Sequence, residues 1–284
     1  MESSISLTTF RDLWIHTGTA CNLSCPFCHE GSSPADTRLG SPTLTELAPL
    51  LDAAAALGVE QFAFTGGEPL ILRDIHAILL HALRLRPVLV LTNGTAPFIR
   101  RAHHLASLRT APHALRFRVS IDYADEERHD AGRGLKNFRK AIDGLRLLHD
   151  AGFECGITRQ QEAGEDSRAI NNRFRNLLRR NRLPEDLPIV SLPELGPLQG
   201  GTFPMTALTS GAAPETCCSR GRMFLKRDGA LRLAPCPLVD DDASMDIPLA
   251  LPAALGQPVA ARHRRCGVCL TQGVNYIGDL HAPV

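Results

Sequence analysis

The chain has 284 residues, of which 44% are hydrophobic, and its 31 basic and 30 acidic residues give a formal net charge of +1. This length allows a sizeable core, and the balanced charge argues against nucleic acid or an anionic membrane as the main partner. No apolar run approaches the roughly 20 residues of a membrane span. The first residues lack a secretory pattern, so a cytoplasmic location is expected. Nine cysteines in a reducing compartment indicate metal binding more than disulfide bonds.

The first two-thirds of the chain alternates between short β-rich runs and helical patterns. Strands are expected over residues 13–17, 61–65, 88–92, 117–121, 153–158 and 189–192. Helices are expected over residues 43–57, 71–85, 98–108, 135–151 and 167–182, the first with a capping box formed by Thr43 and Glu46. This alternation predicts an α/β fold, a partial (β/α)6 barrel, with ligands at the carboxyl ends of its strands.

The character of the sequence changes after about residue 195. Residues 196–214 are rich in Gly, Pro, Thr and Ala and predict a linker, and residues 224–233 predict a hairpin around the Asp228-Gly229 turn. We therefore expect two domains: a core over residues 1–195 and a small, cysteine-rich, hairpin-containing domain over residues 196–284.

Three thiols lie within eight residues just after the first expected strand, at Cys21, Cys25 and Cys28. Thiolates are soft ligands that favour iron–sulfur clusters, zinc or copper(I). A four-iron cluster held by three thiolates leaves one iron open for a reaction. The alternative is a zinc knuckle in which His29 is the fourth ligand.

This spacing, with the aromatic Phe27 before the third cysteine, resembles the signature of the radical S-adenosylmethionine (SAM) superfamily. The resemblance implies that the three cysteines bind a [4Fe–4S] cluster, whose open iron takes the amino and carboxylate groups of SAM. Reductive cleavage of SAM then yields a 5′-deoxyadenosyl radical. A low-potential electron donor such as flavodoxin or ferredoxin is an expected partner.

Further motifs follow at the ends of later expected strands. Thr65-Gly66-Gly67-Glu68-Pro69 resembles the superfamily motif that contacts the SAM amino group; alone, it is equally an ordinary strand–helix turn. Asn93, Ser120 and Asp122 are expected near the SAM ribose, and Arg133 near the SAM carboxylate. The alternatives are turn capping for Asn93 and Ser120 and a surface ion pair for Arg133. Arg159 and His16 lie near strand ends, so either is a candidate to face the substrate. For His16 the alternative is a buried structural role.

A second group of cysteines comprises Cys218, Cys236, Cys266 and Cys269, which is a complete coordination set for a cluster or for zinc. With the Asp-Gly hairpin, this group is similar to a twitch domain, a shortened SPASM domain that holds one auxiliary [4Fe–4S] cluster. A zinc ribbon has the same cysteine pattern and stays the alternative.

Two cysteines remain. Cys217 adjoins a ligand and is able to replace Cys218, and Cys155 alternates along the fifth expected strand. Either thiol is a candidate hydrogen donor to a substrate radical. For Cys155 the simpler interpretation is a small buried hydrophobic residue.

The short length and the four-cysteine appendage resemble the 2-deoxy-scyllo-inosamine dehydrogenase type. That resemblance implies oxidation of a small sugar, aminocyclitol or polyol, with the auxiliary cluster as electron acceptor. Asp240, Asp241 and Asp242 then attract an amine-bearing substrate, unless they form a solvated turn. Alternatives are an epimerase that uses Cys155 or Cys217, a peptide-modifying enzyme, and a non-catalytic zinc-ribbon binding module.

Overall fold

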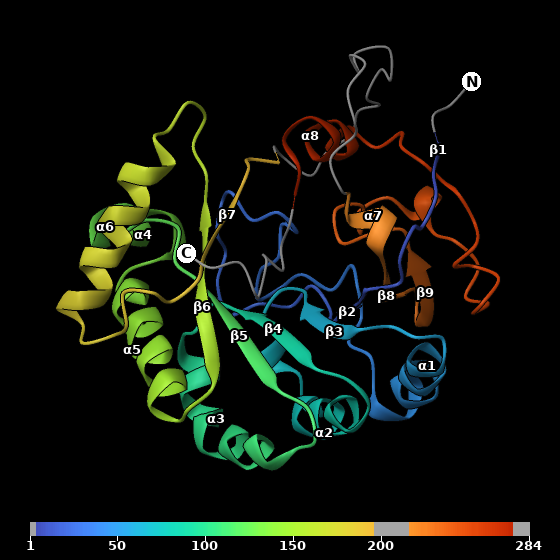
Figure 1. Ribbon diagram of the computed structural model, residues 1–284, viewed down its shortest axis with the longest axis horizontal. Helices are drawn as coiled ribbons and strands as arrows, with labels where there is room; N and C mark the ends of the chain where they lie inside the picture. The colour runs from blue at the N-terminus through green and yellow to red at the C-terminus, as the bar shows by residue number, and fades with distance from the viewer. Residues whose placement is uncertain (1–3, 196–215, 275–284) are drawn as a thin grey trace.

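The computed structural model of the protein describes residues 4–195 and 216–274. Its central feature is an eight-stranded sheet in the order β7-β6-β5-β4-β3-β2-β8-β9. The strands are β2 (Asp12–His16), β3 (Gln61–Thr65), β4 (Val88–Thr92), β5 (Leu115–Ser120), β6 (Glu154–Gln160), β7 (Ile189–Leu192), β8 (Gly221–Arg227) and β9 (Ala230–Ala234). All neighbours from β7 to β8 pair in parallel, and β8 and β9 pair antiparallel. The curved sheet confirms the predicted α/β fold with a partial barrel (Figure 1).

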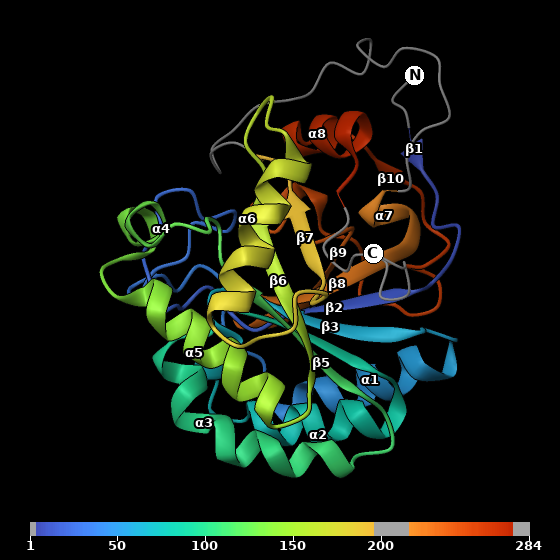
Figure 2. The ribbon, with the colours of Figure 1, turned by 60° about the vertical axis from the view of Figure 1, so that its left-hand side comes forward.

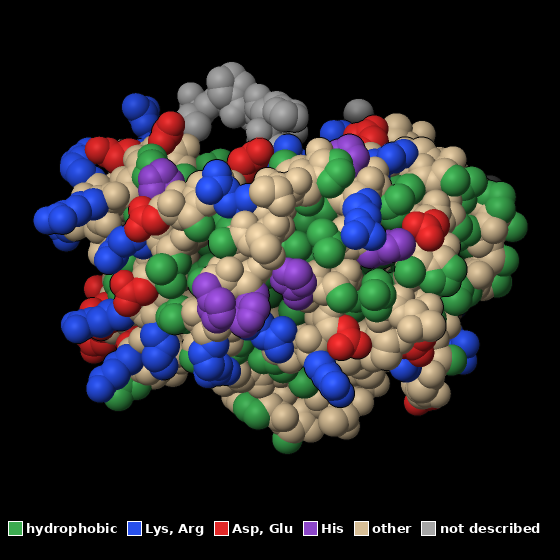
Figure 3. Space-filling view, turned by 90° about the horizontal axis from the view of Figure 1, so that it is seen from below, with side chains coloured by type: hydrophobic (Ala, Val, Ile, Leu, Met, Phe, Trp, Pro, Cys, Tyr) green, Lys and Arg blue, Asp and Glu red, His purple; other side chains and the backbone are tan. Residues whose placement is uncertain are grey.

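Helices cover the outer face of this sheet (Figure 2). They are α1 (Leu44–Ala56), α2 (Ile75–Leu85), α3 (Ala96–Ala106), α5 (Asn137–Asp150) and α6 (Ser167–Arg180). Alternate residues of the strands, such as Phe64 and Phe117, pack against helix residues such as Leu51 and Leu145 in a fully buried core. Basic, acidic and apolar side chains are interspersed over the face of the molecule in Figure 3. Within the described ranges, no helix is both long and apolar enough to cross a membrane.

The helix ends show where the sequence patterns were sufficient. Thr43 and Glu46 form the predicted capping box at the start of α1. The helix expected over residues 71–85 instead starts at Ile75, after a 3-10 turn, η1 (Pro69–Ile71), that the Glu68 side chain caps. The sequence patterns do not predict α4 (Glu126–Arg133), because it is strongly polar and only His129 in it is buried.

The C-terminal segment continues the same sheet. The predicted hairpin is confirmed: β8 and β9 are joined by Asp228 and Gly229, which both have positive φ values, as a tight hairpin turn requires. Strand β8 pairs in parallel with β2, so the hairpin extends the sheet of the core. The division into domains at residue 195 stays a prediction, and the linker predicted over residues 196–214 lies outside the described residues.

Smaller elements complete the C-terminal segment. They are α7 (Cys217–Arg220), η4 (Ala243–Met245), β10 (Val259–Ala260) and α8 (Arg264–Gln272), while η2 (Ser107–Thr110) follows α3 and β1 (Ser4–Ile5) pairs with β10. A second core lies on the inner face of the sheet, where Trp14, Ala63 and Met223 pack with residues of the C-terminal segment. The N-terminal strands and the C-terminal segment therefore pack together in this second core.

Candidate active site

A pocket opens at the carboxyl ends of the strands, where the sequence places its motifs. Cys21, Cys25 and Cys28, in the loop after β2, all contribute to its wall, together with Phe27 and His29. The pKa of the Cys21 thiol is raised to about 12, chiefly by burial and to a smaller extent by the charges of Glu68, Cys25 and Cys28. Burial also raises the pKa of Cys25 and Cys28. The fold therefore brings the three predicted ligands together. Burial disfavours their thiolate forms, and a bound cation would stabilise those forms.

The double glycine after β3 lies against the chain that precedes Cys21. The amide of Gly67 donates to the carbonyl of Gly18 over 2.9 Å, and the amide of Glu68 donates to that of Ala20 over 3.1 Å. A Cβ atom at Gly67 would lie 2.2 Å from the Ala20 carbonyl oxygen, which explains why the position requires glycine. Gly66 and Gly67 line the pocket with their backbone.

Glu68 has a different position from the one expected. Its carboxylate accepts from the amides of Leu70 and Asn93 and from the Thr92 hydroxyl, over 2.8 to 3.1 Å. Only 1% of the residue is exposed, and it is not among the residues that line the pocket. The carboxylate thus fixes the end of β4 to the turn after β3, because three donors already hold it.

Asn93 caps the turn after β4 and also lies at the wall of the pocket. Its side-chain oxygen accepts from the Thr95 amide over 3.0 Å, so it caps the turn. Its side-chain nitrogen donates to Asn22 over 2.9 Å and lies 3.8 Å from the Cys21 sulfur. Asn93 and Ser120 both line the pocket. The end of β4 therefore supports the cysteine loop directly.

Arg133 and Asp122 form a bidentate ion pair at the wall of the pocket. Of the two interpretations of Arg133, the ion pair is therefore present, with Asp122 as the partner, while the contact with the SAM carboxylate stays a prediction. The guanidinium also lowers the pKa of the Cys25 thiol, against the larger effect of burial, and lies 5.8 Å from the centre of the Phe27 ring. A Cβ atom at Gly132 would lie 2.2 Å from that ring, so the glycine lets α4 pack on the cysteine loop.

Arg159 also lines the pocket, but its charge is already compensated. It forms hydrogen bonds with both carboxylate oxygens of Glu165 over 2.6 and 3.0 Å and with Asn171 over 3.1 Å. Only 1% of Arg159 is exposed. The geometry therefore favours a structural ion pair over the predicted catalytic role.

The sequence profile of the Radical SAM superfamily matches residues 15–159, about half of the chain, and this range contains the three cysteines of the pocket and the glycine turn after β3. The chain belongs to this superfamily. Radical SAM proteins use a [4Fe–4S] cluster and SAM, and the three thiols with an adjoining glycine turn fit such a group. His29 is not needed as a fourth protein ligand for that group. Its pKa is lowered to about 4, chiefly by burial and in smaller part by nearby Arg265.

Curated relatives are similar to part of the chain. A probable GTP 3′,8-cyclase of Methanocella arvoryzae is 35% identical over 140 residues, which cover 49% of this chain and 42% of that protein. A GTP 3′,8-cyclase of Cronobacter sakazakii is 36% identical over 151 residues, 51% of this chain and 44% of that protein. The matches span less than half the length of these relatives.

Solved structures share the fold at low sequence identity. Streptococcus suis SuiB bound to S-adenosylmethionine superposes with a TM-score of 0.54 and 18% identity, covering 66% of this chain and 42% of SuiB. The enzyme anSMEcpe with bound AdoMet gives a TM-score of 0.53 and 20% identity, over 68% of this chain and 52% of that chain.

Cys155 lies away from the radical SAM pocket. It packs in the outer core between the sheet and the helices, with 4% of its surface exposed. Burial raises the pKa of its thiol to about 11. This position on the face of the sheet opposite to the pocket argues against a role as hydrogen donor and favours the interpretation as a small buried hydrophobic residue.

The C-terminal cysteines form a second group, which Cys217 joins. Cys218 raises the pKa of both Cys236 and Cys266, in addition to the larger effect of burial. Cys217 forms a hydrogen bond with Cys269, and its sulfur also donates to the carbonyl of Val274 over 3.2 Å. Cys217 therefore lies with the predicted auxiliary ligands and not at the wall of the SAM pocket, which argues against its role as a catalytic hydrogen donor.

This second group borders the SAM pocket. Pro237, next to Cys236, lines the pocket, and Trp14 and Leu192 contribute to both the pocket and the core around the C-terminal cysteines. Arg265, next to Cys266, donates to the carbonyls of Leu238 and His29. The two sets of cysteines thus belong to one continuous region.

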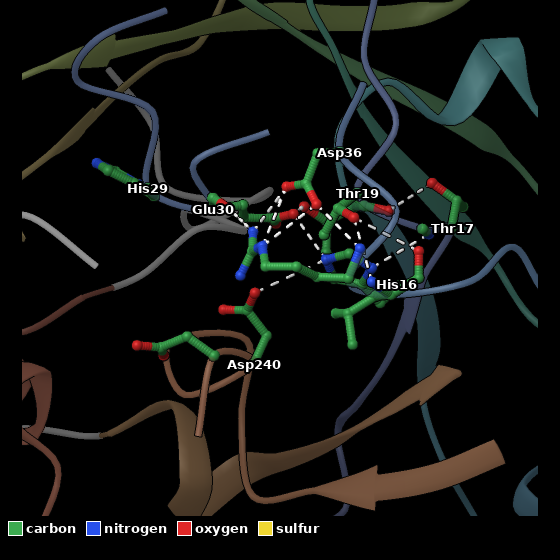
Figure 4. A network of polar contacts seen from close by, with 12 residues as sticks. His16, Thr17, Thr19, His29, Glu30, Asp36 and Asp240 are labelled. Atoms are coloured by element: carbon green, nitrogen blue, oxygen red, sulfur yellow. Dashed lines mark hydrogen bonds and ion pairs between the residues drawn. The ribbon is translucent and has the colours of Figure 1, made fainter. Parts of the chain in front are cut away.

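Figure 4 shows a buried polar network, not predicted from the sequence, in which His16 contacts Glu30 of the cysteine loop and Asp240 of the C-terminal segment. His16 is fully buried, which confirms its structural interpretation, and its Nε2 atom lies 2.6 Å from Glu30 and 4.0 Å from Asp240. Its Nδ1 atom accepts from the Gly18 amide, so Nε2 carries the proton that faces Glu30. In Figure 4 the Asp240 carboxylate approaches from the C-terminal segment, and the His29 side chain points away.

The aspartate run has a different role from both sequence hypotheses. Asp240 is completely buried, and burial raises its pKa to about 7. Asp241 pairs with His263 over 3.3 Å, and Asp242 caps η4. None of the three lines the described SAM pocket. They therefore neither attract a substrate amine there nor form a fully solvated turn.

Proposed function

We propose that the protein is a radical SAM enzyme with two cluster sites, in which Cys21, Cys25 and Cys28 hold the cluster that binds SAM. The cluster, when bound, supplies the electron that cleaves SAM reductively to a 5′-deoxyadenosyl radical. The observation that carries the proposal is the convergence of three thiols, a glycine turn and a polar rim on one pocket.

The surrounding residues hold SAM in this proposal. The backbone of Gly66 and Gly67 lines the pocket, where it faces the amino group of SAM in this proposal. Asn93 and Ser120 offer polar groups for the ribose, and the ion pair of Asp122 with Arg133 keeps the adjoining wall charged but balanced. Phe27 packs the cysteine loop onto α4.

For the second site we propose Cys218, Cys236, Cys266 and Cys269 as ligands of an auxiliary [4Fe–4S] cluster in a twitch-like segment over residues 196–284. We prefer Cys218 to Cys217 because the Cys218 thiol raises the pKa of both Cys236 and Cys266, whereas the Cys217 thiol forms hydrogen bonds with Cys269 and with the Val274 carbonyl. Structural zinc is the alternative for four thiolates.

The reaction we propose is oxidation of a small sugar, aminocyclitol or polyol. An alcohol carbon gives up one hydrogen atom to the deoxyadenosyl radical, then one proton and one electron, and becomes a ketone. That electron leaves toward the C-terminal cysteine site, which borders the pocket through Pro237. The first electron comes from a donor such as flavodoxin or ferredoxin.

A cyclisation of a nucleotide is the second candidate, because the curated relatives are GTP 3′,8-cyclases. The region in common covers about half of this chain, so it supports the radical chemistry more than the choice of substrate. The epimerase alternative loses its support, since Cys155 and Cys217 both lie away from the pocket wall.

Anaerobic reconstitution tests the proposal. We expect about eight iron atoms per chain and SAM-dependent formation of 5′-deoxyadenosine with a chemical reductant. Cys25→Ala should abolish the nucleoside product, and Cys155→Ala is the matched control that keeps it. About four irons with one zinc would support the zinc alternative, and no 5′-deoxyadenosine from the iron-loaded protein would contradict the radical SAM proposal.

A further inference from the structure

We propose that the substrate carries an anionic oxygen group, a carboxylate or a phosphate, and that Arg118 binds it below the floor of the SAM pocket. The inference rests on the proposed function, because it concerns the substrate of the same site. It adds a residue that the sequence motifs do not indicate.

The position of Arg118 follows from the strand register. Phe117 and Val119 face the helices in the outer core, so Arg118 and Ser120 face the interior of the barrel. Arg118 pairs with Leu91 on β4, and Ser120 pairs with Thr158 on β6. Those three neighbours all line the pocket. Arg118 is therefore the next inward residue below the pocket.

Its charge has no carboxylate partner within the described residues. Arg118 is 2% exposed, and its one hydrogen bond there runs from Nη1 to the Phe117 carbonyl over 3.4 Å. The Nε and Nη2 atoms are buried without a hydrogen-bond acceptor. The nearby carboxylate of Glu154 already pairs with Arg116 over 2.7 Å. A buried guanidinium stays protonated, so this position favours an anionic ligand.

The other arginines of the pocket differ in this respect. Arg133 pairs with Asp122, and Arg159 pairs with Glu165. Both of those side chains are paired with a carboxylate, whereas Arg118 keeps two buried nitrogen atoms without a hydrogen-bond partner among the described residues. A ligand that brings its own negative charge would therefore gain most at Arg118.

Strand β6, beside Arg118, makes room for the guanidinium at Gly156 and offers a second hydrogen-bond donor at Thr158. A Cβ atom at Gly156 would lie 3.1 Å from Nη1 of Arg118 and 2.5 Å from the Pro188 carbonyl, so glycine makes room for the guanidinium. Two residues further along β6, the Thr158 hydroxyl is buried without a partner and lines the pocket. The two side chains offer the combination of a cation and a hydroxyl that suits carboxylate or phosphate oxygens.

Binding of simple anions to the reconstituted, SAM-loaded protein tests the inference. We would titrate inorganic phosphate and, separately, acetate at constant ionic strength, and follow heat release and the melting temperature. The wild type should bind at least one of the two anions, and the stronger one identifies the group. Arg118→Gln should weaken that binding by roughly tenfold or more, the loss expected when one partner of a buried charge pair is removed.

Matched variants make the result specific. Arg116→Gln, on the same strand but paired with Glu154, should keep wild-type anion binding and wild-type formation of 5′-deoxyadenosine. Thr158→Val should weaken binding by a smaller factor. If Arg118→Gln fails to fold, Arg118→Lys keeps the charge but loses the planar donor pair, and it should bind the anion several-fold more weakly.

Two failures are distinguishable. The role of Arg118 would be overturned if the wild type forms 5′-deoxyadenosine but binds neither anion. It would also be overturned if the variants at residue 118 bind the anion as tightly as the wild type does. Wild type that forms no 5′-deoxyadenosine would instead contradict the proposed function.

Discussion

Arg265 donates a hydrogen bond to the backbone carbonyl of His29, and so joins the helix that carries Cys266 and Cys269 to the loop that carries Cys28. A second hydrogen bond, to Leu238, adds the segment after Cys236. One fully buried guanidinium thus holds together three of the segments that supply thiols to the two sites.

Replacement of Arg265 by methionine should therefore affect both sites. The loss of its buried hydrogen bonds should lower the free energy of unfolding by about 3 kcal/mol, since Asp240 and two carbonyls lose their nearest cation. Iron content after reconstitution should fall. Arg262→Met is the control, because among the described residues the Arg262 side chain forms hydrogen bonds only with the exposed Ser244 and with Met245. Unchanged iron content in Arg265→Met would contradict the bridging role.

Gly132→Ala should disturb the cysteine loop from a distance. The added Cβ atom would lie 2.2 Å from the Phe27 ring, so either α4 or the loop must move. Overpacking of this kind costs about 1–3 kcal/mol. We expect a lower melting temperature and weaker SAM binding, measured as the spectral change of the reconstituted protein on addition of SAM. Gly256→Ala, whose Cβ atom would have 3.7 Å to its nearest neighbour, should behave as wild type.

The ion pair of Glu165 with Arg159 predicts a pH-dependent stability. Burial alone would raise the pKa of Glu165, but hydrogen bonds from Arg159, the Glu162 amide and Ser167 outweigh it and hold the pKa below its usual 4.5. The stabilisation is therefore complete above pH 4.5 and is lost as the pH falls through the lower value of the folded state.

Glu165→Gln tests this dependence. It should destabilise the protein by about 1–3 kcal/mol at neutral pH, because Arg159 is left nearly buried without its carboxylate. The difference from wild type should shrink toward pH 4, as followed by melting temperature across a pH series. Glu185→Gln, on the surface, should have little effect. A difference that is constant with pH would show that the charge of Glu165 is not the cause.

Cys155→Ala should leave the chemistry intact. The thiol packs in the outer core, so its loss should cost about 1 kcal/mol of stability, while iron content and 5′-deoxyadenosine formation stay at wild-type levels. Loss of the nucleoside product in a folded, iron-loaded variant would contradict the placement of Cys155 outside the site.

The sequence was most informative where the signal is local. Cysteine spacing, the glycine turn and the alternation of strands and helices are all contained within short windows, and they located the sheet and the pocket. Helix α4 was not predicted, because a polar helix lacks the periodic apolar residues on which such a prediction depends.

Contacts between distant segments could not be predicted in this way. Glu30 and Asp240 meet at His16 across more than 200 residues, and no spacing rule links them. The unpaired state of Arg118 and the engaged state of Arg133 depend equally on which carboxylates the fold brings near. Charge pairing is a property of the folded arrangement, so sequence patterns identify candidate arginines without their partners.

The parallel pairing of β8 with β2 has a consequence for how the chain folds. Before β8 pairs with it, β2 has one open edge, whose backbone N–H and C=O groups are free to pair with other chains. A truncated protein ending at residue 195 should therefore self-associate and aggregate, even though it retains the whole segment that matches the superfamily.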